Sequence, residues 1–217
     1  MPSDRTAIVT GASSGIGRET AILLAEAGYN VTLTSRTPDE LNRTAEMAAK
    51  KAGNGAATLV VPADLGDPDM CRDVGQKTVE TFGRVDGLAN IAGSVCMKSI
   101  GESTAPEWAR IVDVNLSAII YLTAAAWPQF KKQNAGVVVN VSSMASIDPF
   151  PGLWMYAAAK AGVNMFTRCT AAEGEKMGLR AVAIAPGAVE TPMLRSIFSQ
   201  KQIPADNTLA PTDVATL

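Results

Sequence analysis

The sequence contains no histidine, and its 217 residues include only three cysteines. Without histidine, a Ser-His-Asp hydrolase triad is excluded, and so is a metal site built on imidazole ligands. Cys71, Cys96 and Cys169 are widely spaced and follow no metal-ligand pattern. They indicate reduced thiols in a cytoplasmic protein, and we expect no bound metal ion.

Long hydrophobic runs and basic clusters are also absent. The longest apolar stretch, Ala118 to Trp127, is interrupted by Thr123 and is too short to cross a bilayer. The first five residues contain no apolar signal core. No basic stretch exceeds two adjacent lysines, as at 131–132, and the net charge is −2. We therefore expect neither nucleic acid nor a membrane as a partner.

What the sequence does contain is a regular alternation of strand-like and helix-like segments. This alternation predicts an α/β fold with a doubly wound parallel sheet, a three-layer α/β/α Rossmann fold, as one domain over 1–217. We expect strands at 7–9, 30–34, 57–61, 87–90, 136–141 and 179–185, and helices at 18–27, 38–52, 69–82, 107–132 and 156–177. A turn at 53–55 should close the second helix, Gly178 should end the last, and the helix at 107–132 should bend or break near Pro128.

A glycine-rich loop, Thr10-Gly-Ala-Ser-Ser-Gly-Ile-Gly17, lies between the first predicted strand and the first predicted helix. Its glycines permit a tight turn and a close approach of the backbone to a pyrophosphate, which the free N–H groups of the helix N-terminus can bind. The alternative is a packing turn, but the strand–turn–helix context favours a dinucleotide site. The predicted contacts in this loop are Gly11, Ser13, Ser14, Gly15, Ile16 and Gly17.

Tyr156 and Lys160 stand four residues apart on a predicted helix and share one face, and Ser143 precedes Tyr156 by thirteen residues. A nearby ammonium favours a phenolate, so we expect Lys160 to lower the pKa of Tyr156. The phenol could then exchange a proton with an alcohol or a ketone, while Ser143 steadies the substrate oxygen. Alone, this spacing also describes a half-buried aromatic residue beside a solvated lysine.

Together these residues make the sequence similar to the short-chain dehydrogenase/reductase family, in its branch of single-domain oxidoreductases. The resemblance also rests on Asn90-Ile-Ala-Gly93, on Asn115, and on Pro186-Gly187 followed by Thr191. It implies hydride transfer between a nicotinamide and a ketone or secondary alcohol. The segment 156–162 is similar to 3-oxoacyl-[acyl-carrier-protein] reductases, which makes a 3-oxoacyl thioester one candidate substrate, although Ala172 stands where those reductases often carry an arginine.

The resemblance assigns roles to individual residues. It implies that Tyr156 is the proton donor, that Ser143 polarises the carbonyl, and that Lys160 also binds the nicotinamide ribose. Asn115 would hold a water that links Lys160 to solvent, or would bridge a defect in its helix. The other implied cofactor contacts follow strand ends: Asp64, Leu65, Asn90, Ala92, Gly93, Pro186, Gly187, Val189 and Thr191. For Asp64, a helix cap before Pro68 is an equal alternative.

The choice of cofactor depends on the end of the second predicted strand, where the sequence reads Ser35-Arg36. An acid at this place would bind the ribose 2′-hydroxyl of NAD and repel a 2′-phosphate, whereas a guanidinium binds phosphate bidentately. We therefore predict NADP(H). NAD(H) stays open, because Arg36 could be merely solvated and because Asp39 and Glu40 lie nearby.

The segment 189–208 is expected to form a lid over the substrate. Its apolar residues and others before the catalytic helix would line a pocket for an apolar carbonyl compound, or would simply pack in the fold. These residues are Val95, Met97, Ile147, Phe150, Leu153, Trp154, Met193, Leu194, Ile197, Phe198 and Ile203.

The resemblance also implies a homo-oligomer, a dimer or tetramer, paired through the helices at 107–132 and 156–177. Family members continue past a helix near 211 to a seventh strand, so we expect that strand to be missing from this sequence. The alternative function is a non-catalytic NADP(H)-binding regulator. Such proteins usually lose the tyrosine or the lysine, whereas here Asn115, Ser143, Tyr156 and Lys160 are all present.

Overall fold

A computed structural model of the protein describes residues 4–53 and 55–217. All its strand pairs are parallel, and they form one six-stranded sheet in the order β3-β2-β1-β4-β5-β6. The strands are β1 (Thr6–Thr10), β2 (Asn30–Ser35), β3 (Thr58–Pro62), β4 (Gly87–Asn90), β5 (Gly136–Val141) and β6 (Leu179–Ile184). The predicted fold class, a doubly wound parallel sheet, is confirmed.

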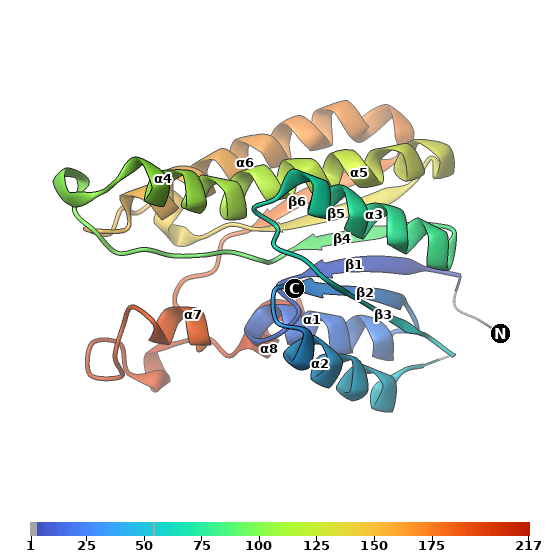
Figure 1. The fold of residues 1–217 in the computed structure, drawn as a ribbon, viewed down its shortest axis with the longest axis horizontal. Coiled ribbons are helices and arrows are strands. Elements are labelled where there is room, and N and C mark those ends of the chain that lie inside the picture. The colour runs from blue at the N-terminus through green and yellow to red at the C-terminus, as the bar shows by residue number, and fades with distance from the viewer. Residues whose placement is uncertain (1–3, 54) are drawn as a thin grey trace.

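Helices cover both faces of this sheet (Figure 1). One face carries α1 (Gly15–Glu26), α2 (Pro38–Lys51) and α8 (Pro211–Ala215), and the other carries α3 (Pro68–Phe82), α4 (Ala105–Val112), α5 (Ala118–Gln133) and α6 (Trp154–Gly174). The face changes because the chain travels outward from β1 to β3 and then crosses back to β4. The short α7 (Pro192–Arg195) lies beyond the carboxyl ends of the strands (Figure 1).

The central strand β1 shows why the sheet is buried on both sides. Ile8 packs in a cluster with Leu122 and Phe130 of α5, whereas its neighbour Val9 packs in a cluster with Ile22 of α1 on the opposite face. Successive side chains of a strand point to opposite faces, so a strand covered by helices on both sides must be apolar at every position. This requirement explains the short continuous apolar runs in the sequence.

The switch point between β1 and β4 sets the place of the site. The strands on either side of this pair are reached in opposite directions, so the loops after β1 and β4 diverge and leave a crevice at the carboxyl edge. The Thr10 hydroxyl spans the crevice floor by accepting hydrogen bonds from Ile91 N (2.8 Å) and Ala92 N (2.9 Å). Residues that follow strand ends therefore meet here.

The helix predicted at 107–132 differs from expectation at Pro128. Helix α5 continues through Pro128, and the irregularity lies earlier, in a π-helical turn at Asp113–Ser117 that joins α4 to α5. There the Asn115 side chain donates to the Ile111 carbonyl (2.8 Å), a main-chain acceptor of the same helix. A side chain that occupies such a carbonyl displaces the regular bonding and widens the turn.

The other predicted boundaries agree with the structure within a few residues. Helix α6 is followed by a 3-10 turn at Glu175–Met177, and Gly178 ends it in the left-handed conformation (φ 67°), as predicted. Further 3-10 turns lie at Ile100–Glu102, Met144–Ser146 and Ala205–Asn207. Asn54, in the turn predicted after α2, and residues 1–3 lie outside the described residues.

The helical segment Ala105–Gln133 is long and apolar enough to cross a membrane, by length and composition alone. It is longer than the stretch considered from the sequence, because the π-helical turn joins α4 to α5. Its buried side chains, among them Ala118, Leu122 and Phe130, pack on the sheet. Only 44% of its most apolar window is buried, so apolar residues also occupy its outer face.

Candidate active site

The glycine-rich loop lies at the carboxyl end of β1 and leads directly into α1. Gly11 and Gly15 adopt positive φ angles of 66° and 53°, which strain any residue with a side chain. A Cβ atom on Gly17 would lie 2.3 Å from the Gly11 carbonyl oxygen, so only glycine lets the helix start so close to the strand. The six predicted loop residues all line one cavity of about 520 Å³.

One end of the cavity is formed by the residues after β2 and β3. Ser35, Arg36 and Thr37 line it, whereas Asp39 and Glu40 do not. Glu40 instead forms ion pairs with Arg18 (2.6 Å) and Arg43 (2.9 Å) on the far side of the loop. The exposed Arg36 forms no hydrogen bond or ion pair with another described residue.

Asp64 and Leu65 line the same end, and Asp64 is held by an arginine that sequence reasoning missed. Arg110 of α4 donates to Asp64 Oδ2 at 3.0 Å. Burial by itself raises the pKa of Asp64, but hydrogen bonds from Gly66 N–H and Arg110, with the charges of Arg110 and Arg36, hold it below the usual value. No local sequence pattern links residues 46 positions apart, so this pair could not be predicted.

The loop after β4 contributes Ala92 and Gly93 to the cavity, but not the side chain of Asn90. Asn90 is buried and donates to Asn140 Oδ1 (2.8 Å), which in turn donates to Thr167 of α6 (2.8 Å). Its amide links β4 to β5 and α6 through these bonds, and its predicted contact with a cofactor stays a prediction.

Asn115 is likewise absent from the cavity wall and stands behind it. Its side chain donates to Ser94 O (2.8 Å) and accepts from Ser94 N (3.3 Å), in addition to its bond with Ile111 O. It makes no hydrogen bond to Lys160 among the described residues. Asn115 thus holds the short strip formed by Gly93 and Ser94 in place. It also bridges a defect in its own helix, which is one of the two roles predicted for it from the sequence.

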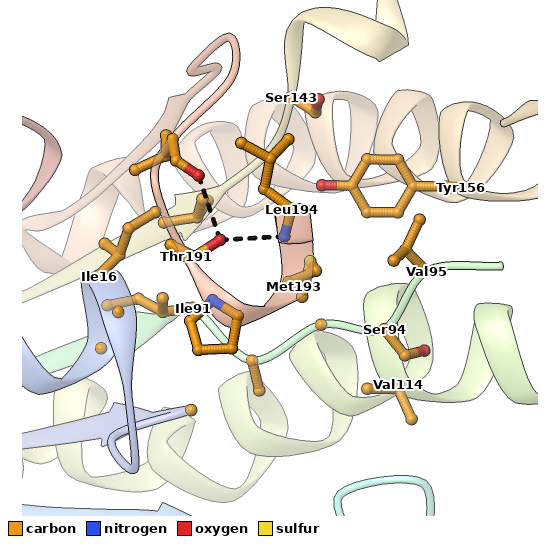
Figure 2. Close-up of a pocket in the computed structure, with 18 of the residues that line it drawn as sticks. Ile16, Ile91, Ser94, Val95, Val114, Ser143, Tyr156, Thr191, Met193 and Leu194 are labelled. Atoms are coloured by element: carbon orange, nitrogen blue, oxygen red, sulfur yellow. Dashed lines mark hydrogen bonds between the residues drawn. The ribbon is translucent and has the colours of Figure 1, made fainter. Parts of the chain in front are cut away.

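Ser143, Tyr156 and Lys160 meet on the wall formed by the end of β5 and the start of α6. Tyr156 lies in the first turn of α6, with the Ser143 hydroxyl near its own. Lys160, one turn later, donates to the Val141 carbonyl at 2.6 Å. All three residues line the cavity. In Figure 2 the Tyr156 hydroxyl points away from α6, toward Leu194.

The pKa directions at this wall differ from the expectation that Lys160 activates Tyr156. Burial raises the pKa of Tyr156, and the hydrogen bond with Ser143 opposes this only in part. Burial also lowers the pKa of Lys160 to about 8. The Lys160 ammonium lies 5.5 Å from the Tyr156 ring centre and is bonded to Val141, so it does not contact the phenolic oxygen. In this structure burial therefore disfavours the phenolate.

A second chain of hydrogen bonds positions Ser143 and was not foreseen. Asn164 of α6 donates to the Ser146 hydroxyl (2.9 Å), which donates to the Ser143 carbonyl (2.6 Å). The Ser143 hydroxyl also accepts from Ala145 N at 3.1 Å. These contacts tie the turn at Met144–Ser146 to the helix that carries Tyr156.

The residues after β6 close the cavity from the side of the glycine loop. Pro186, Gly187, Val189 and Thr191 all line it, as predicted. Thr191 accepts from Leu194 N (3.2 Å) and donates to Val189 O (3.2 Å), which starts α7 (Figure 2). Its methyl group faces Gly15, at 2.9 Å from where a Cβ would be. The two cofactor loops predicted at opposite ends of the chain therefore touch.

Residues 189–208, predicted to form a lid and called the lid below, contribute several side chains to the same cavity. Val189 pairs with Leu209 in an isolated parallel bridge, so the two ends of the lid are joined at its base. Of the apolar residues predicted for the pocket, eight line the cavity: Val95, Phe150, Leu153, Met193, Leu194, Ile197, Phe198 and Ile203.

Met97, Ile147 and Trp154 do not line the cavity. Ile147 is 71% exposed, while Trp154 stacks on Trp108 with 5.5 Å between ring centres and donates to Ser103 (3.1 Å). These positions had no periodicity that could separate them from true pocket residues.

Comparison with known proteins agrees with this geometry. The family model of the short chain dehydrogenases matches residues 5–202. An uncharacterized oxidoreductase of Staphylococcus saprophyticus is 35% identical over 88% of this chain and 80% of its own length. Levodione reductase of Leifsonia aquatica is 35% identical over 94% of this chain and 76% of its own length. A crystal structure of levodione reductase superposes with a TM-score of 0.90 at 30% identity, covering 100% of this chain and 89% of that one.

Proposed function

Because this chain belongs to the short-chain dehydrogenase family, and is an oxidoreductase that uses a nicotinamide cofactor, we propose that it interconverts a ketone and a secondary alcohol with NADP(H). The proposal rests on one observation, that the catalytic residues and the predicted cofactor residues line the same cavity. Ser143, Tyr156 and Lys160 stand at one end, while the glycine loop and Arg36 stand at the other.

The cavity walls fit a dinucleotide. The backbone approach at Gly17 leaves no room for a Cβ, and the N-terminus of α1 opens into the cavity beside Ser13 and Ser14. Such a helix start supplies N–H donors and positive dipole for a pyrophosphate. We assign the 2′-phosphate to Arg36, whose side chain makes no hydrogen bond or ion pair with another described residue, and the adenine side to Asp64 and Leu65.

At the catalytic end, each side chain has a distinct task. The bound nicotinamide supplies or accepts the hydride. The hydroxyl of Tyr156 donates its proton to the carbonyl oxygen, and Ser143 holds that oxygen by a second hydrogen bond. Burial raises the pKa of Tyr156 and disfavours the phenolate. Lys160, held by its hydrogen bond to the Val141 carbonyl, would supply a positive charge and a donor to the nicotinamide ribose.

The test is a panel of carbonyl compounds with NADPH, followed by absorbance of the reduced nicotinamide, in the parent and in Tyr156→Phe. Removing only the hydroxyl should leave the fold and NADPH binding intact and lower turnover about 10²–10⁴-fold. If the variant keeps most of the turnover, Tyr156 is a packing residue and the assigned mechanism fails. NADPH binding without any turnover of the panel would instead support the non-catalytic regulator.

We further propose that the protein is cytoplasmic and self-associates. Cys71, Cys96 and Cys169 are all free thiols, which persist in a reducing compartment. The outer faces of α5 and α6 carry exposed apolar side chains, among them Ile120 and Met165. An exposed apolar face of this kind favours pairing with a second copy of the chain.

A further inference from the structure

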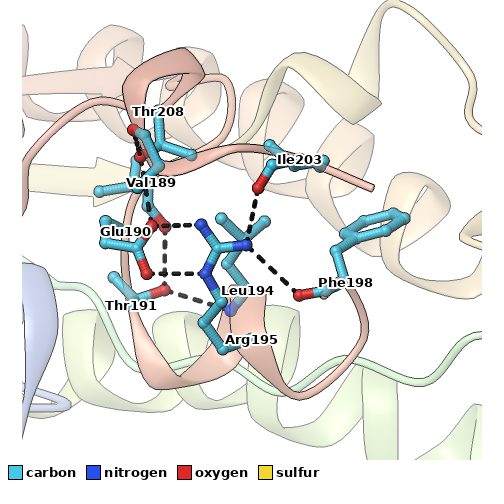
Figure 3. A network of polar contacts seen from close by, with 9 residues as sticks. Val189, Glu190, Thr191, Leu194, Arg195, Phe198, Ile203 and Thr208 are labelled. Carbon is cyan, nitrogen blue, oxygen red and sulfur yellow. Dashed lines mark hydrogen bonds and ion pairs between the residues drawn. The ribbon is translucent and has the colours of Figure 1, made fainter. Parts of the chain in front are cut away.

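The lid is folded around a charged pair of its own. The Arg195 guanidinium donates to both carboxylate oxygens of Glu190, at 2.7 Å from Nε, and to the Ile203 carbonyl at 2.8 Å (Figure 3). It also lies 3.5 Å from the Phe198 carbonyl. Neither Glu190 nor Arg195 lines the cavity. The pair therefore anchors the backbone of Phe198 and Ile203 from behind and directs apolar side chains inward.

Two phenylalanines connect this lid to the catalytic wall. Phe150, from the segment between β5 and α6, and Phe198 of the lid meet edge to face, with ring centres 5.2 Å apart at 84°. Phe198 is buried at 7% exposure, whereas Phe150 is 46% exposed. Both line the cavity. An edge-to-face pair is favourable, so these rings form the closing contact over the substrate end.

The charges around the cavity are distributed unequally. Among the described residues, the charged groups that line it are Arg36, Asp64, Arg110, Asp148 and Lys160. The first three belong to the end formed after β2 and β3, and Lys160 is bonded to Val141. The substrate end is thus left with one exposed carboxylate, Asp148, and with no free cation.

An anionic substrate would meet this end unfavourably. A carboxylate or phosphate would lose water against apolar walls and would be repelled by the exposed Asp148, while the Lys160 ammonium is already hydrogen-bonded to Val141. A buried charge without a full set of partners is costly. A neutral ring would instead displace water from the apolar side chains of Phe150, Phe198 and Leu153, which is favourable.

Resting on the proposed oxidoreductase function, we propose that the substrate is an uncharged ketone with an apolar body about the size of a ring, and that Phe150 and Phe198 select it by size. Asp148 excludes anionic compounds, including thioesters of phosphorylated carriers. Arg195 is a positioning residue that holds Phe198 in place.

The test compares methyl 4-acetylbenzoate with 4-acetylbenzoate, two ketones that differ in charge but share one aryl body, and adds butanone as a small neutral ketone. At saturating NADPH, we expect kcat/KM to favour the ester over the carboxylate by about tenfold or more. Asp148→Asn should narrow this preference. Phe150→Ala and Phe198→Ala should each raise KM for the ester about tenfold and change that for butanone little. Ile147→Ala, a neighbouring exposed residue outside the cavity, is the control.

Equal use of the carboxylate and the ester overturns the charge selection, and equal effects of the phenylalanine variants on both neutral ketones overturn the size selection. Calorimetry on the NADPH complex of Tyr156→Phe separates this proposal from the proposed function. Tighter binding of the ester than of the carboxylate, without turnover in the parent, supports the pocket assignment while refuting the reaction. Failure of the ester to bind overturns the substrate class.

Discussion

Lys160 carries its ammonium group in a position that is only 2% exposed, where desolvation lowers its pKa to about 8 from 10.5. Below pH 8 the folded and unfolded chains both hold this proton, so the cost of burying the charge is present in full. As pH rises from 8 toward 10.5, the folded chain releases the proton first, and the cost disappears. At neutral pH the buried Lys160 therefore destabilises the folded chain, so its presence is explained by its chemistry and not by stability.

Replacing Lys160 with Met should therefore stabilise the fold at pH 7. A pKa shift of this size corresponds to roughly 3 kcal/mol, reduced by ~1 kcal/mol for the lost hydrogen bond to Val141. The gain should shrink as the pH approaches 10. Urea unfolding at pH 7 and pH 10 measures it, with the exposed Lys131→Met as control. A variant that is less stable than the parent at pH 7 contradicts the argument.

Arg36 decides the choice of cofactor if the 2′-phosphate lies at the end of β2. Arg36→Asp should weaken NADPH binding about 10–100-fold, because a hydrogen-bonded charge is lost and a repulsive one appears. NADH binding should change little or improve. Fluorescence titration with both cofactors measures this without any turnover.

The matched control is Arg43→Asp, a similar charge change on the exposed surface of α2, where Arg43 pairs with Glu40 outside the cavity. It should leave the ratio of the two affinities unchanged. Equal affinities of the parent for NADPH and NADH would remove the basis for preferring NADP(H).

At the level of elements, the π-helical turn at Asp113–Ser117 joins fold and site. Asn115 bonds Ile111 in its own helix and Ser94 in the strip after β4, and Ser94 lines the cavity. A Cβ on Gly93 would lie 2.8 Å from Asn115 Oδ1, so the strip and the turn are fitted closely together. The position of the helix at this turn therefore sets the position of Ser94 in the cavity wall.

We expect Asn115→Ala to destabilise the fold by about 2–3 kcal/mol, because two carbonyls and one N–H lose their partner. It should also weaken NADPH binding, because the Asn115 side chain no longer holds the strip at 93–94 in the cavity wall. Thr123→Val is the control, because Thr123 bonds only the Ile119 carbonyl of its own helix (2.7 Å). That variant should lose stability without losing NADPH affinity. Urea unfolding and NADPH titration separate the two effects.

The elements themselves follow from the sequence where local chemistry decides. The strands are short apolar runs, and the glycines at 11, 15 and 17 mark a turn that no other residue fits. Pro128 was misjudged because its position on the exposed face of α5 cannot be read locally. There water can bond the carbonyl that the proline leaves unpaired, so the helix continues.

The sequence predicts which residues at strand ends line the cavity, but not the contacts behind them. Residues such as Asp64 and Thr191 reach the cavity because parallel strands end at one edge. The contacts of Arg110 with Asp64, and of Asn164 with Ser146, join residues far apart in sequence. The raised pKa of Tyr156 also depends on burial in three dimensions, which the spacing to Lys160 does not reveal.

At the level of the whole molecule, the outer face of α5 and α6 has no role in the site but carries exposed apolar side chains. A hollow of about 340 Å³ lies between these helices, lined by Ile120, Thr123, Ala124, Trp127, Phe166, Cys169, Thr170 and Glu173. Tyr121 and Met165 are also exposed nearby. Gly162 of α6 packs within the chain, because a Cβ there would lie 2.8 Å from the Leu116 side chain.

Ala124→Arg should shift the protein from a dimer or tetramer toward the monomer, as measured by sedimentation velocity at micromolar concentration. Ala124 is exposed in the single chain, so the arginine can extend into solvent and the fold should keep its stability. In a paired state it would place an unpartnered charge against an apolar face. Met47→Arg, at an exposed methionine of α2, controls for added charge. A parent protein that sediments only as a monomer refutes the pairing, and this outer face would then need another occupant to explain its apolar side chains.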